Sequence, residues 1–399
     1  MKSWTWLVFS LSCAGLTLLA VSPPRTALAQ DADDDPYYDV DPDWPQPLSQ
    51  DLDWTRTAAV YAESPNRIYV FQTGQVPLAY RKEPVRDPLH PNWPHKPFPG
   101  LSNCKSSRCE PGQGDIIDGA TKRPIPGSRW DHLMNVFDAG GRLIESWGQA
   151  FNDQVLNPHG VQIDPNDPQR HVWVLDNGGH RVLKYTHDGK TLVLAIGELG
   201  QTASDRTHLG GPSGIAFFPN GDLLVSDGYV NSRVVRFSKD GTYMTEWGTK
   251  GSGPGQFDTP HSVEILADGR IIVGDRGNKR IQFFDRNGRY LTEIMAVYPN
   301  DLAISADQRY LYVCQGGPDA ATEIRTYSIS GPPRLVSSWG RPFGAKPGTI
   351  WGAHGFSRDS DGNLYLAESW GGRVWKYAVK KGVAPNTLPI GPLKRNTFK

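Results

Sequence analysis

Apolar and polar residues alternate along most of this chain, and the alternation returns in similar blocks. From residue 155 onward, five blocks repeat an alternating segment, a tight turn, a second segment ending in an acid or amide, and a third segment. In the third segment, Arg-Val or Arg-Ile usually leads into an aromatic residue. Alternation with a period of two predicts strands, and Asn220-Gly221 and Asp268-Gly269 predict hairpin turns. Each block is therefore predicted to be an antiparallel meander.

The spacing of the blocks predicts the architecture. Equivalent starts at Pro158, Pro212, Pro260, Pro299 and Ala353 lie roughly 40 to 55 residues apart, which is typical of propeller blades. One meander cannot bury both of its faces, so blades must pack around a ring. A further blade is predicted upstream, with two strands in 58–74 and two in 132–148. The predicted fold is all-β, a six-bladed β-propeller over residues 57–379.

Four segments lie outside this repeat. Residues 1–29 run from Met-Lys through an apolar stretch to Ala-Leu-Ala, which predicts a signal peptide cleaved near Ala29 and export to the periplasm or the medium. Residues 30–56 are acidic and rich in proline, and are predicted to form an arm or a strap that closes the ring. Residues 81–128 are predicted to be a long loop inserted in the first blade, and 380–399 a tail.

Composition narrows the classes of function. Lys plus Arg and Asp plus Glu both total 42, so no overall charge attracts nucleic acid or an anionic membrane. No segment after the leader has the roughly 18 consecutive apolar residues of a membrane span. Cys104 and Cys109 are close enough to form a small disulfide loop in an oxidising compartment, leaving Cys314 alone. Function is therefore expected to come from a local site.

One repeat position carries the candidate chemistry. The residue after the block start is His159, Ser213, His261, Asn300 and His354 in turn, so histidine occurs in alternate blades. Blade starts lie near the axis of a propeller, and alternate blades of a sixfold ring are about 120° apart. Three imidazoles are predicted to converge there, the composition of a zinc site with an open fourth position. The alternative is that each histidine bonds separately to nearby backbone.

A family resemblance extends this hypothesis. The strings DGYVNSR, GQFDTPHS and DRGNKRIQ, all between Ser226 and Phe284, resemble the peptidyl-α-hydroxyglycine α-amidating lyase family, which is built on NHL-type propellers. The resemblance covers five of the six blades. It implies cleavage of a peptidyl-α-hydroxyglycine to a peptide amide and glyoxylate, and hence a small carboxylated or peptide-derived substrate. It implies metal ligands for zinc or another divalent transition metal at His159, His261 and His354, and catalytic residues at Tyr229, Arg233 and Arg276.

The sequence also departs from the family. Thr73 stands where the family has a catalytic arginine, and Arg129 or Arg81 of the inserted loop are the candidate replacements. Gly352 and Gly355 stand where the family has a substrate-contacting Met and an Asp linked to a structural calcium, so calcium is a weaker expectation than zinc.

These departures leave a second class of function open. In that hypothesis the chain is a non-catalytic NHL propeller that binds a protein, peptide or glycan through its upper loops. The aromatic residues Trp93, Trp351 and Trp370, expected to be exposed, favour it. A third class, calcium-assisted lactone or ester hydrolysis, needs a channel lined by carboxylates, whereas the predicted ring is lined by histidines.

Overall fold

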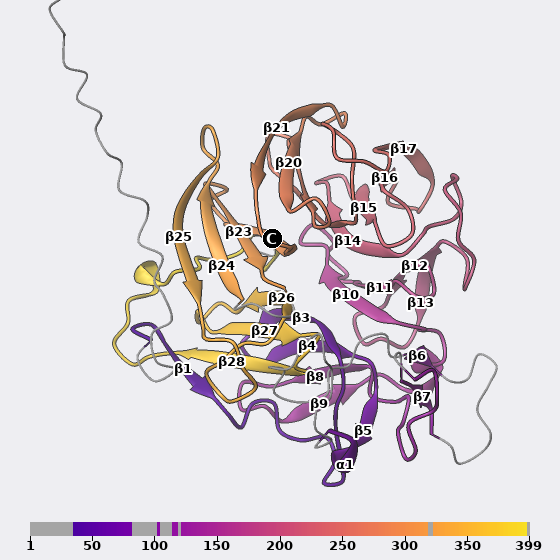
Figure 1. The fold of residues 1–399 in the computed structure, drawn as a ribbon, viewed down its shortest axis with the longest axis vertical. Coiled ribbons are helices and arrows are strands. Elements are labelled where there is room, and N and C mark those ends of the chain that lie inside the picture. Colours follow the sequence, from indigo (N-terminus) through magenta and orange to yellow (C-terminus); the bar gives the residue numbers. More distant parts are fainter. Residues whose placement is uncertain (1–34, 82–101, 104–113, 119–120, 318–321, 397–399) are drawn as a thin grey trace, which may run out of the picture.

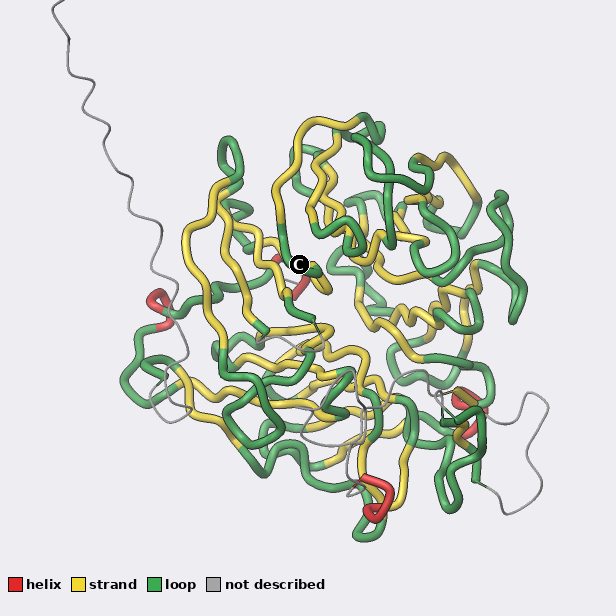
Figure 2. Tube along the Cα trace, in the orientation of Figure 1, coloured by secondary structure: helices red, strands yellow, loops and turns green. Residues whose placement is uncertain are grey.

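The chain folds into a ring of β-sheets. The computed structural model describes residues 35–81, 102–103, 114–118, 121–317 and 322–396. Within these residues, six four-stranded antiparallel sheets stand around a central axis (Figure 1). Figure 2 shows that strands form the blades and that loops connect them around the ring. The prediction of an all-β, six-bladed propeller is therefore confirmed.

In each blade the first strand lies beside the axis and the fourth lies outside. Blade one contains β3 (Thr57–Ser64), β4 (Arg67–Gln72), β8 (Met134–Phe137) and β9 (Leu143–Ser146). Blade two contains β10 (Pro158–Ile163), β11 (Val172–Asp176), β12 (Arg181–Tyr185) and β13 (Leu192–Ile196), and blade three contains β14 (Pro212–Phe217), β15 (Leu223–Asp227), β16 (Arg233–Phe237) and β17 (Tyr243–Trp247). Blade four contains β18 (Pro260–Ile265), β19 (Ile271–Asp275), β20 (Arg280–Phe284) and β21 (Tyr290–Met295), and blade five contains β22 (Pro299–Ile304), β23 (Tyr310–Gln315), β24 (Glu323–Ser328) and β25 (Arg334–Gly340).

Blade six joins the two ends of the ring. Its inner strands are β26 (Ala353–Arg358), β27 (Leu364–Glu368) and β28 (Arg373–Val379), and its outer strand is β1 (Tyr38–Asp41). Tyr38 pairs with Val379 at one end of this antiparallel contact. Trp44, which follows β1, is buried against Tyr365 and Phe137 of blades six and one. This part of segment 30–56 is therefore a strap that closes the ring rather than a free arm.

Shorter elements decorate the ring. The strand β2 (Leu52–Trp54) pairs with β5 (Gln75–Pro77), and β6 (Ser102–Asn103) pairs with β7 (Ile116–Ile117). The helical turns are α1 (Leu78–Arg81), α2 (Gln149–Asn152), η2 (Pro385–Thr387) and η3 (Lys394–Asn396). None of the helices in the described ranges has the length and hydrophobicity needed to cross a bilayer. The predicted signal peptide, Cys104 and Cys109 lie outside the described residues.

The core consists of six hydrophobic clusters, each between two neighbouring blades. The cluster between blades two and three, for example, packs Trp173 and Leu175 against Ile215 and Phe217. Successive side chains of a strand point to opposite faces, and strands such as β11, β15 and β19 are buried at every position, so both faces of a blade are covered by its neighbours. Every blade therefore has both of its apolar faces buried only when the ring is complete.

A buried acid at the end of the second strand anchors the loop that leads to the axis. In blade four, Asp275 is fully buried, accepts a hydrogen bond from the amide of Asp258 at 2.7 Å, and pairs with Arg280 at 2.8 Å. Arg280 also donates to the backbone oxygens of Ser252 and Gly253. The equivalent acid and arginine pairs are Asp176–Arg181, Asp227–Arg233 and Glu368–Arg373. These pairs belong to the scaffold and fix the start of the inner strand in blades two, three, four and six.

A β-bulge then turns one side chain of each inner strand toward the axis. In blade two, Pro158 pairs with Asp176 and Gly160 with Leu175, so His159 between them has no partner on β11. An extra residue in a strand redirects its side chain out of the sheet. The same irregularity occurs at the start of all six inner strands. The bulge residues are Ala58, His159, Ser213, His261, Asn300 and His354.

Candidate metal centre at the propeller axis

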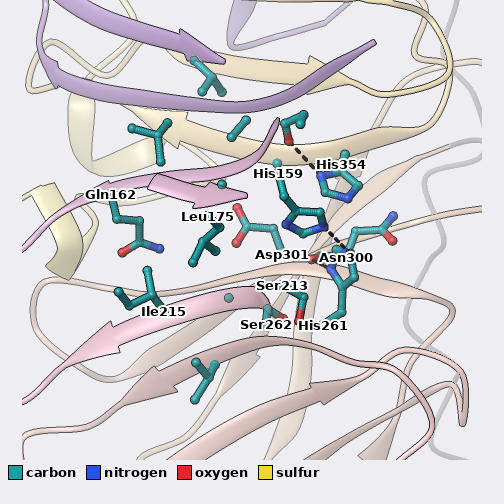
Figure 3. A pocket seen from close by; sticks show the side chains of 18 of the residues that line it. His159, Gln162, Leu175, Ser213, Ile215, His261, Ser262, Asn300, Asp301 and His354 are labelled. Atoms are coloured by element: carbon teal, nitrogen blue, oxygen red, sulfur yellow. Dashed lines mark hydrogen bonds between the residues drawn. The ribbon is translucent and has the colours of Figure 1, made fainter. Parts of the chain in front are cut away.

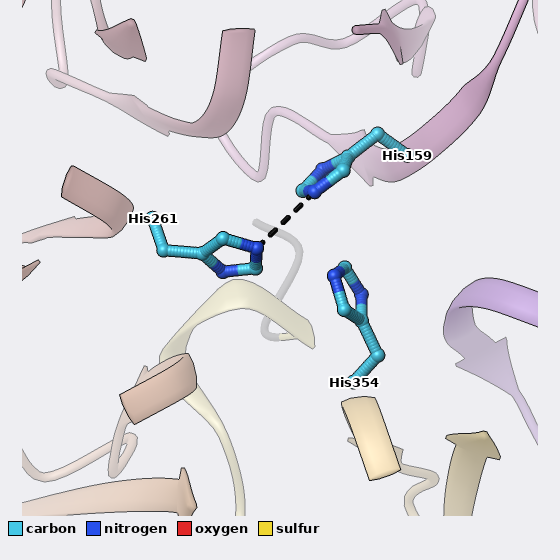
Figure 4. Close-up of side chains that lie close together, drawn as sticks. All are labelled: His159, His261 and His354. Carbon is cyan, nitrogen blue, oxygen red and sulfur yellow. Dashed lines mark hydrogen bonds between the residues drawn. The ribbon is translucent and has the colours of Figure 1, made fainter. Parts of the chain in front are cut away.

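The three bulge histidines face one another across the axis. They come from blades two, four and six, and their imidazole rings form a triangle (Figure 4). The ring centroids are 4.9 Å apart for His159 and His261, 4.7 Å for His159 and His354, and 4.8 Å for His261 and His354. The structure therefore brings together the three predicted metal ligands, and one nitrogen of each lies within 4.8 Å of the others.

The backbone of neighbouring blades orients the imidazoles. Nδ1 of His261 lies 2.6 Å from the carbonyl oxygen of Asn300, and Nδ1 of His354 lies 2.8 Å from that of Ala58. Nδ1 of His159 is buried without a hydrogen-bond partner. Because a carbonyl oxygen only accepts, Nδ1 of His261 and His354 must carry the proton. This assignment leaves their Nε2 lone pairs free, as is typical of metal-binding histidines.

The Nε2 atoms of the three histidines point toward one another. Nε2 of His159 lies 3.2 Å from Nε2 of His261, and Nε2 of His354 is buried without a hydrogen-bond partner. Facing lone pairs repel unless a cation or a shared proton lies between them. Zinc binds imidazole nitrogen at about 2.0–2.1 Å, which puts nitrogens in a tetrahedral site about 3.4 Å apart. The donor set, and the spacing of His159 and His261, therefore fit a zinc-like ion.

Burial keeps these imidazoles neutral. It lowers the pKa of His159 and His261 well below the ordinary range, and lowers the pKa of His354 to about 3. The positive charges of Arg56 and Arg276 act in the same direction on His354. An additional proton on this cluster is therefore disfavoured at neutral pH, and neutral imidazoles are the form that binds metal.

Tyr229 lies at the open end of this triangle. Its hydroxyl oxygen is 3.0 Å from Nε2 of both His159 and His261, and its ring remains 40% exposed. Tyr229 belongs to the loop between β15 and β16, which lies against Gly211. Gly211 has a φ of +81°, and a β-carbon there would come within 2.6 Å of Cβ of Tyr229. Glycine is therefore needed at that position for the loop to bring the phenol to the histidines.

One predicted arginine reaches this site and one does not. Nη1 of Arg276 lies 3.3 Å from the Tyr229 hydroxyl, and its guanidinium lies 5.1 Å from the centre of the tyrosine ring. The expectation that Arg233 lies near the substrate is wrong. Arg233 is 2% exposed and bonds to Asp227 and Glu246, because it starts β16 at the position of the blade arginines.

The sequence interpretation missed Arg56. This residue directly precedes β3 and is 9% exposed, and its Nη1 donates to Oδ1 of Asn157 at 2.6 Å. Thr73, at the family's arginine position, donates from its amide and its hydroxyl to the Arg56 carbonyl oxygen. The useful signal was register: Arg56 lies two residues before Ala58, the bulge residue of blade one. Among the described residues, no contact joins the side chain of Arg129 to the histidines, and the side chain of Arg81 lies outside the description.

A narrow cavity extends along the axis below the histidines. Gln162 and Asp301 line it, as Figure 3 shows, and Arg395 of η3 also lines it. Arg395 is 7% exposed, contacts Asp301 at 3.1 Å and donates to the backbone oxygen of Phe356. The C-terminal tail therefore lines this channel together with the histidines, of which His159 and His261 are 2% and 1% exposed, and Tyr229 covers their Nε2 atoms.

Of the three aromatic residues expected to be exposed, Trp351 is fully buried and Trp370 is partly buried. Trp93 lies outside the described residues. The expectation of an exposed Trp351 is therefore wrong. The indole lies against Phe343 in the interior of the loop that precedes β26, where it supports the start of that strand.

Known proteins share this architecture. A family model described as a 6-bladed beta-propeller matches residues 201–329. NHL repeat-containing protein 3 of Homo sapiens is 30% identical over 257 residues, covering 60% of this chain and 69% of that protein. Peptidyl-glycine alpha-amidating monooxygenase B of Xenopus laevis is 30% identical over 252 residues, covering 60% of this chain and 28% of that protein.

A third relative is named as the lyase, without the monooxygenase. A probable peptidyl-alpha-hydroxyglycine alpha-amidating lyase of Caenorhabditis elegans is 36% identical over 146 residues, covering 36% of this chain and 40% of that protein. The chain therefore spans little more than a quarter of the monooxygenase and two fifths of the lyase.

Proposed function

Because the chain belongs to the family of NHL-type six-bladed β-propellers, whose members include proteins named as α-amidating lyases, we propose that it is an exported, metal-dependent carbon–nitrogen lyase. The substrate is an α-hydroxyglycine-type compound, and the products are an amide and glyoxylate. The leader-like residues 1–29 support export. The observation that carries the proposal is a phenol 3.0 Å from two of three converging, neutral histidines.

His159, His261 and His354 would hold the metal through Nε2, each contributing one neutral nitrogen. The ion would supply a Lewis acid at an open fourth position and polarise an oxygen of the substrate. The chain's own part is to exclude bulk water from this position. Arg395 of the tail lines the channel on one side of the histidines, and Tyr229, which is 40% exposed, covers the other side and would have to admit the substrate.

Tyr229 is the group best placed to move the proton. In the proposed reaction, its deprotonated oxygen takes the proton of the substrate hydroxyl, the carbon–oxygen double bond of glyoxylate forms, and the carbon–nitrogen bond breaks. The amide nitrogen then receives that proton, so no further reactant is consumed. Arg276, 3.3 Å from the phenol oxygen, favours negative charge there during the transfer.

One observation favours the second class of function. Gly352 has a φ of +66°, and a β-carbon there would come within 2.2 Å of the Trp370 ring, so a methionine does not fit where the lyase family contacts substrate. A non-catalytic NHL propeller that binds a protein, peptide or glycan through its upper loops would have no need of that contact. The two hypotheses differ in turnover, which an assay can measure directly.

The deciding experiment measures metal content and glyoxylate release on the same preparation. The mature protein is purified, reconstituted with zinc, and analysed for bound metal. Glyoxylate is then followed during incubation with α-hydroxyhippuric acid. We expect close to one zinc per chain and glyoxylate release that stops when a chelator removes the metal.

Two results would overturn the proposal. Bound zinc without glyoxylate release would reject the lyase and keep the metal site. Failure to bind zinc after reconstitution would reject both, and would favour the non-catalytic propeller. A His187→Ala variant provides the matched control, because this histidine contacts Glu63 at a turn between β12 and β13 rather than the triangle.

A further inference from the structure

The environment of Arg56 is unusual for a buried arginine. Its side chain is 9% exposed, yet its one hydrogen bond is to the neutral amide of Asn157. Among the described residues no carboxylate pairs with it. The blade arginines Arg233 and Arg280 are equally buried, but each is paired with an acid at 3.0 Å or less. A buried charge without a counter-ion is costly, so the site of Arg56 is built for a charge that arrives from outside.

A second arginine faces the same space. Arg276 likewise has no carboxylate partner among the described residues, and its contact is with the hydroxyl of Tyr229. The Tyr229 hydroxyl is in turn 3.0 Å from Nε2 of His159 and of His261. Arg56 is held by Asn157, which lies two residues before His159 in the same chain segment. Two positive charges therefore lie beside the three imidazoles. Such a site attracts an anion and holds it between the charges.

Arg56 is also held in place before any ligand binds. Its carbonyl oxygen accepts hydrogen bonds from the amide of Thr73 at 3.1 Å and from the Thr73 hydroxyl at 3.2 Å. Asn157, which holds the guanidinium, is fixed in turn because its backbone amide donates a hydrogen bond to Oδ1 of Asp176 at 2.8 Å. Blades one and two therefore both position Arg56. A guanidinium held in this way loses little freedom when it binds a planar anion through two hydrogen bonds.

We propose that Arg56 and Arg276 form an anion subsite beside the three histidines, that it binds a carboxylate, and that Arg56 determines the preference for a carboxylate over a neutral group. This inference rests on the proposed function for the identity of the anion. It assigns substrate recognition to a residue of the segment before the first blade, outside every repeat. Arg56 is a specificity residue in this proposal, whereas Tyr229 remains the proton carrier.

The test compares two probes of similar shape, one with a terminal carboxylate and one with a neutral amide in its place. Hippurate carries the carboxylate and lacks the hydroxyl that the reaction requires, and hippuramide is its neutral amide. Binding of both is measured by calorimetry, with zinc-loaded and with metal-free protein. We expect wild-type protein to prefer hippurate, and Arg56→Met to lose about 10- to 100-fold in hippurate affinity, the range for a charge-assisted contact. Hippuramide affinity and zinc content should not change.

Two further variants keep the result interpretable. Arg56→Lys retains the charge and loses the planar fork, so it should fall between wild type and Arg56→Met. Arg289→Met serves as the surface control, since this arginine is 80% exposed in its side chain and pairs with Asp285 in a turn. If the Arg56 variants do not fold, the preference of wild-type protein for hippurate over hippuramide still tests the subsite.

The outcomes separate this inference from the lyase. Hippurate binding that depends on Arg56, without glyoxylate release from α-hydroxyhippuric acid, would support the subsite and reject the lyase. Glyoxylate release with an unchanged KM in Arg56→Met would support the lyase and overturn the subsite. Equal binding of hippurate and hippuramide by wild-type protein, or no binding of hippurate, would also overturn it.

Discussion

Glu264 is expected to make the stability of this propeller depend on pH. This residue lies on β18, three positions after His261, and is 7% exposed. Burial raises the pKa of Glu264 from 4.5 to about 7, against the opposing charges of Lys394 and Arg395. Between these two pH values the folded chain keeps a proton that the unfolded chain releases. The contribution of Glu264 to the free energy of unfolding is therefore fully present below about pH 4.5. It falls by about 3 kcal/mol in total as the pH rises to 7.

Glu264→Gln should remove this dependence, because the amide has nearly the same shape and does not ionise. Urea unfolding of metal-free protein at pH 5 and pH 8 measures the free energy of unfolding of wild type and variant. We expect little difference at pH 5 and a variant more stable by about 3 kcal/mol at pH 8. Asp240→Asn, at an exposed turn of blade three, should change neither value. A difference that is constant with pH, or that shrinks as the pH rises, would refute the reasoning.

Three further predictions concern the axis. His261→Ala should lower bound zinc sharply while the circular dichroism spectrum stays that of a propeller, and unchanged zinc content would contradict the three-histidine site. Tyr229→Phe should keep the zinc and slow glyoxylate release by at least about 100-fold, the scale of a lost proton carrier, so full activity would exclude its assigned role. Arg395→Ala leaves Asp301 without its cation and should lower the free energy of unfolding by about 3 kcal/mol in a urea titration, whereas a change below about 1 kcal/mol would show that the tail contributes little.

The repeat made the fold and the triangle of histidines predictable. Alternating residues and turns define each blade locally, and the position after the block start is the same in every blade. The sequence does not reveal the bulge that turns His159 toward the axis, because a bulge depends on the pairing of two strands. The shared repeat position was nevertheless sufficient to predict that His261 and His354 lie beside His159.

The arginines were harder to predict because the same residue type serves two purposes. Arg233 resembles a site residue within its motif, yet Arg181, Arg280 and Arg373 recur at the same repeat position, and this recurrence marks a scaffold role. Arg276 lies one residue beyond a strand end, where the loop faces the axis. Arg56 was assigned to an arm, and only the closed ring reveals that it faces blade two through Asn157.

The pairing of β1 with β28 has a consequence for assembly. Among the described strands β1 comes first in the chain and β28 comes last, so β1 stays unpaired until the rest of the ring has been synthesised. An unpaired strand edge accepts any suitable strand, including β1 of a second copy. At high concentration, refolding from denaturant should therefore yield exchanged dimers beside monomers, with each ring closed by the other chain.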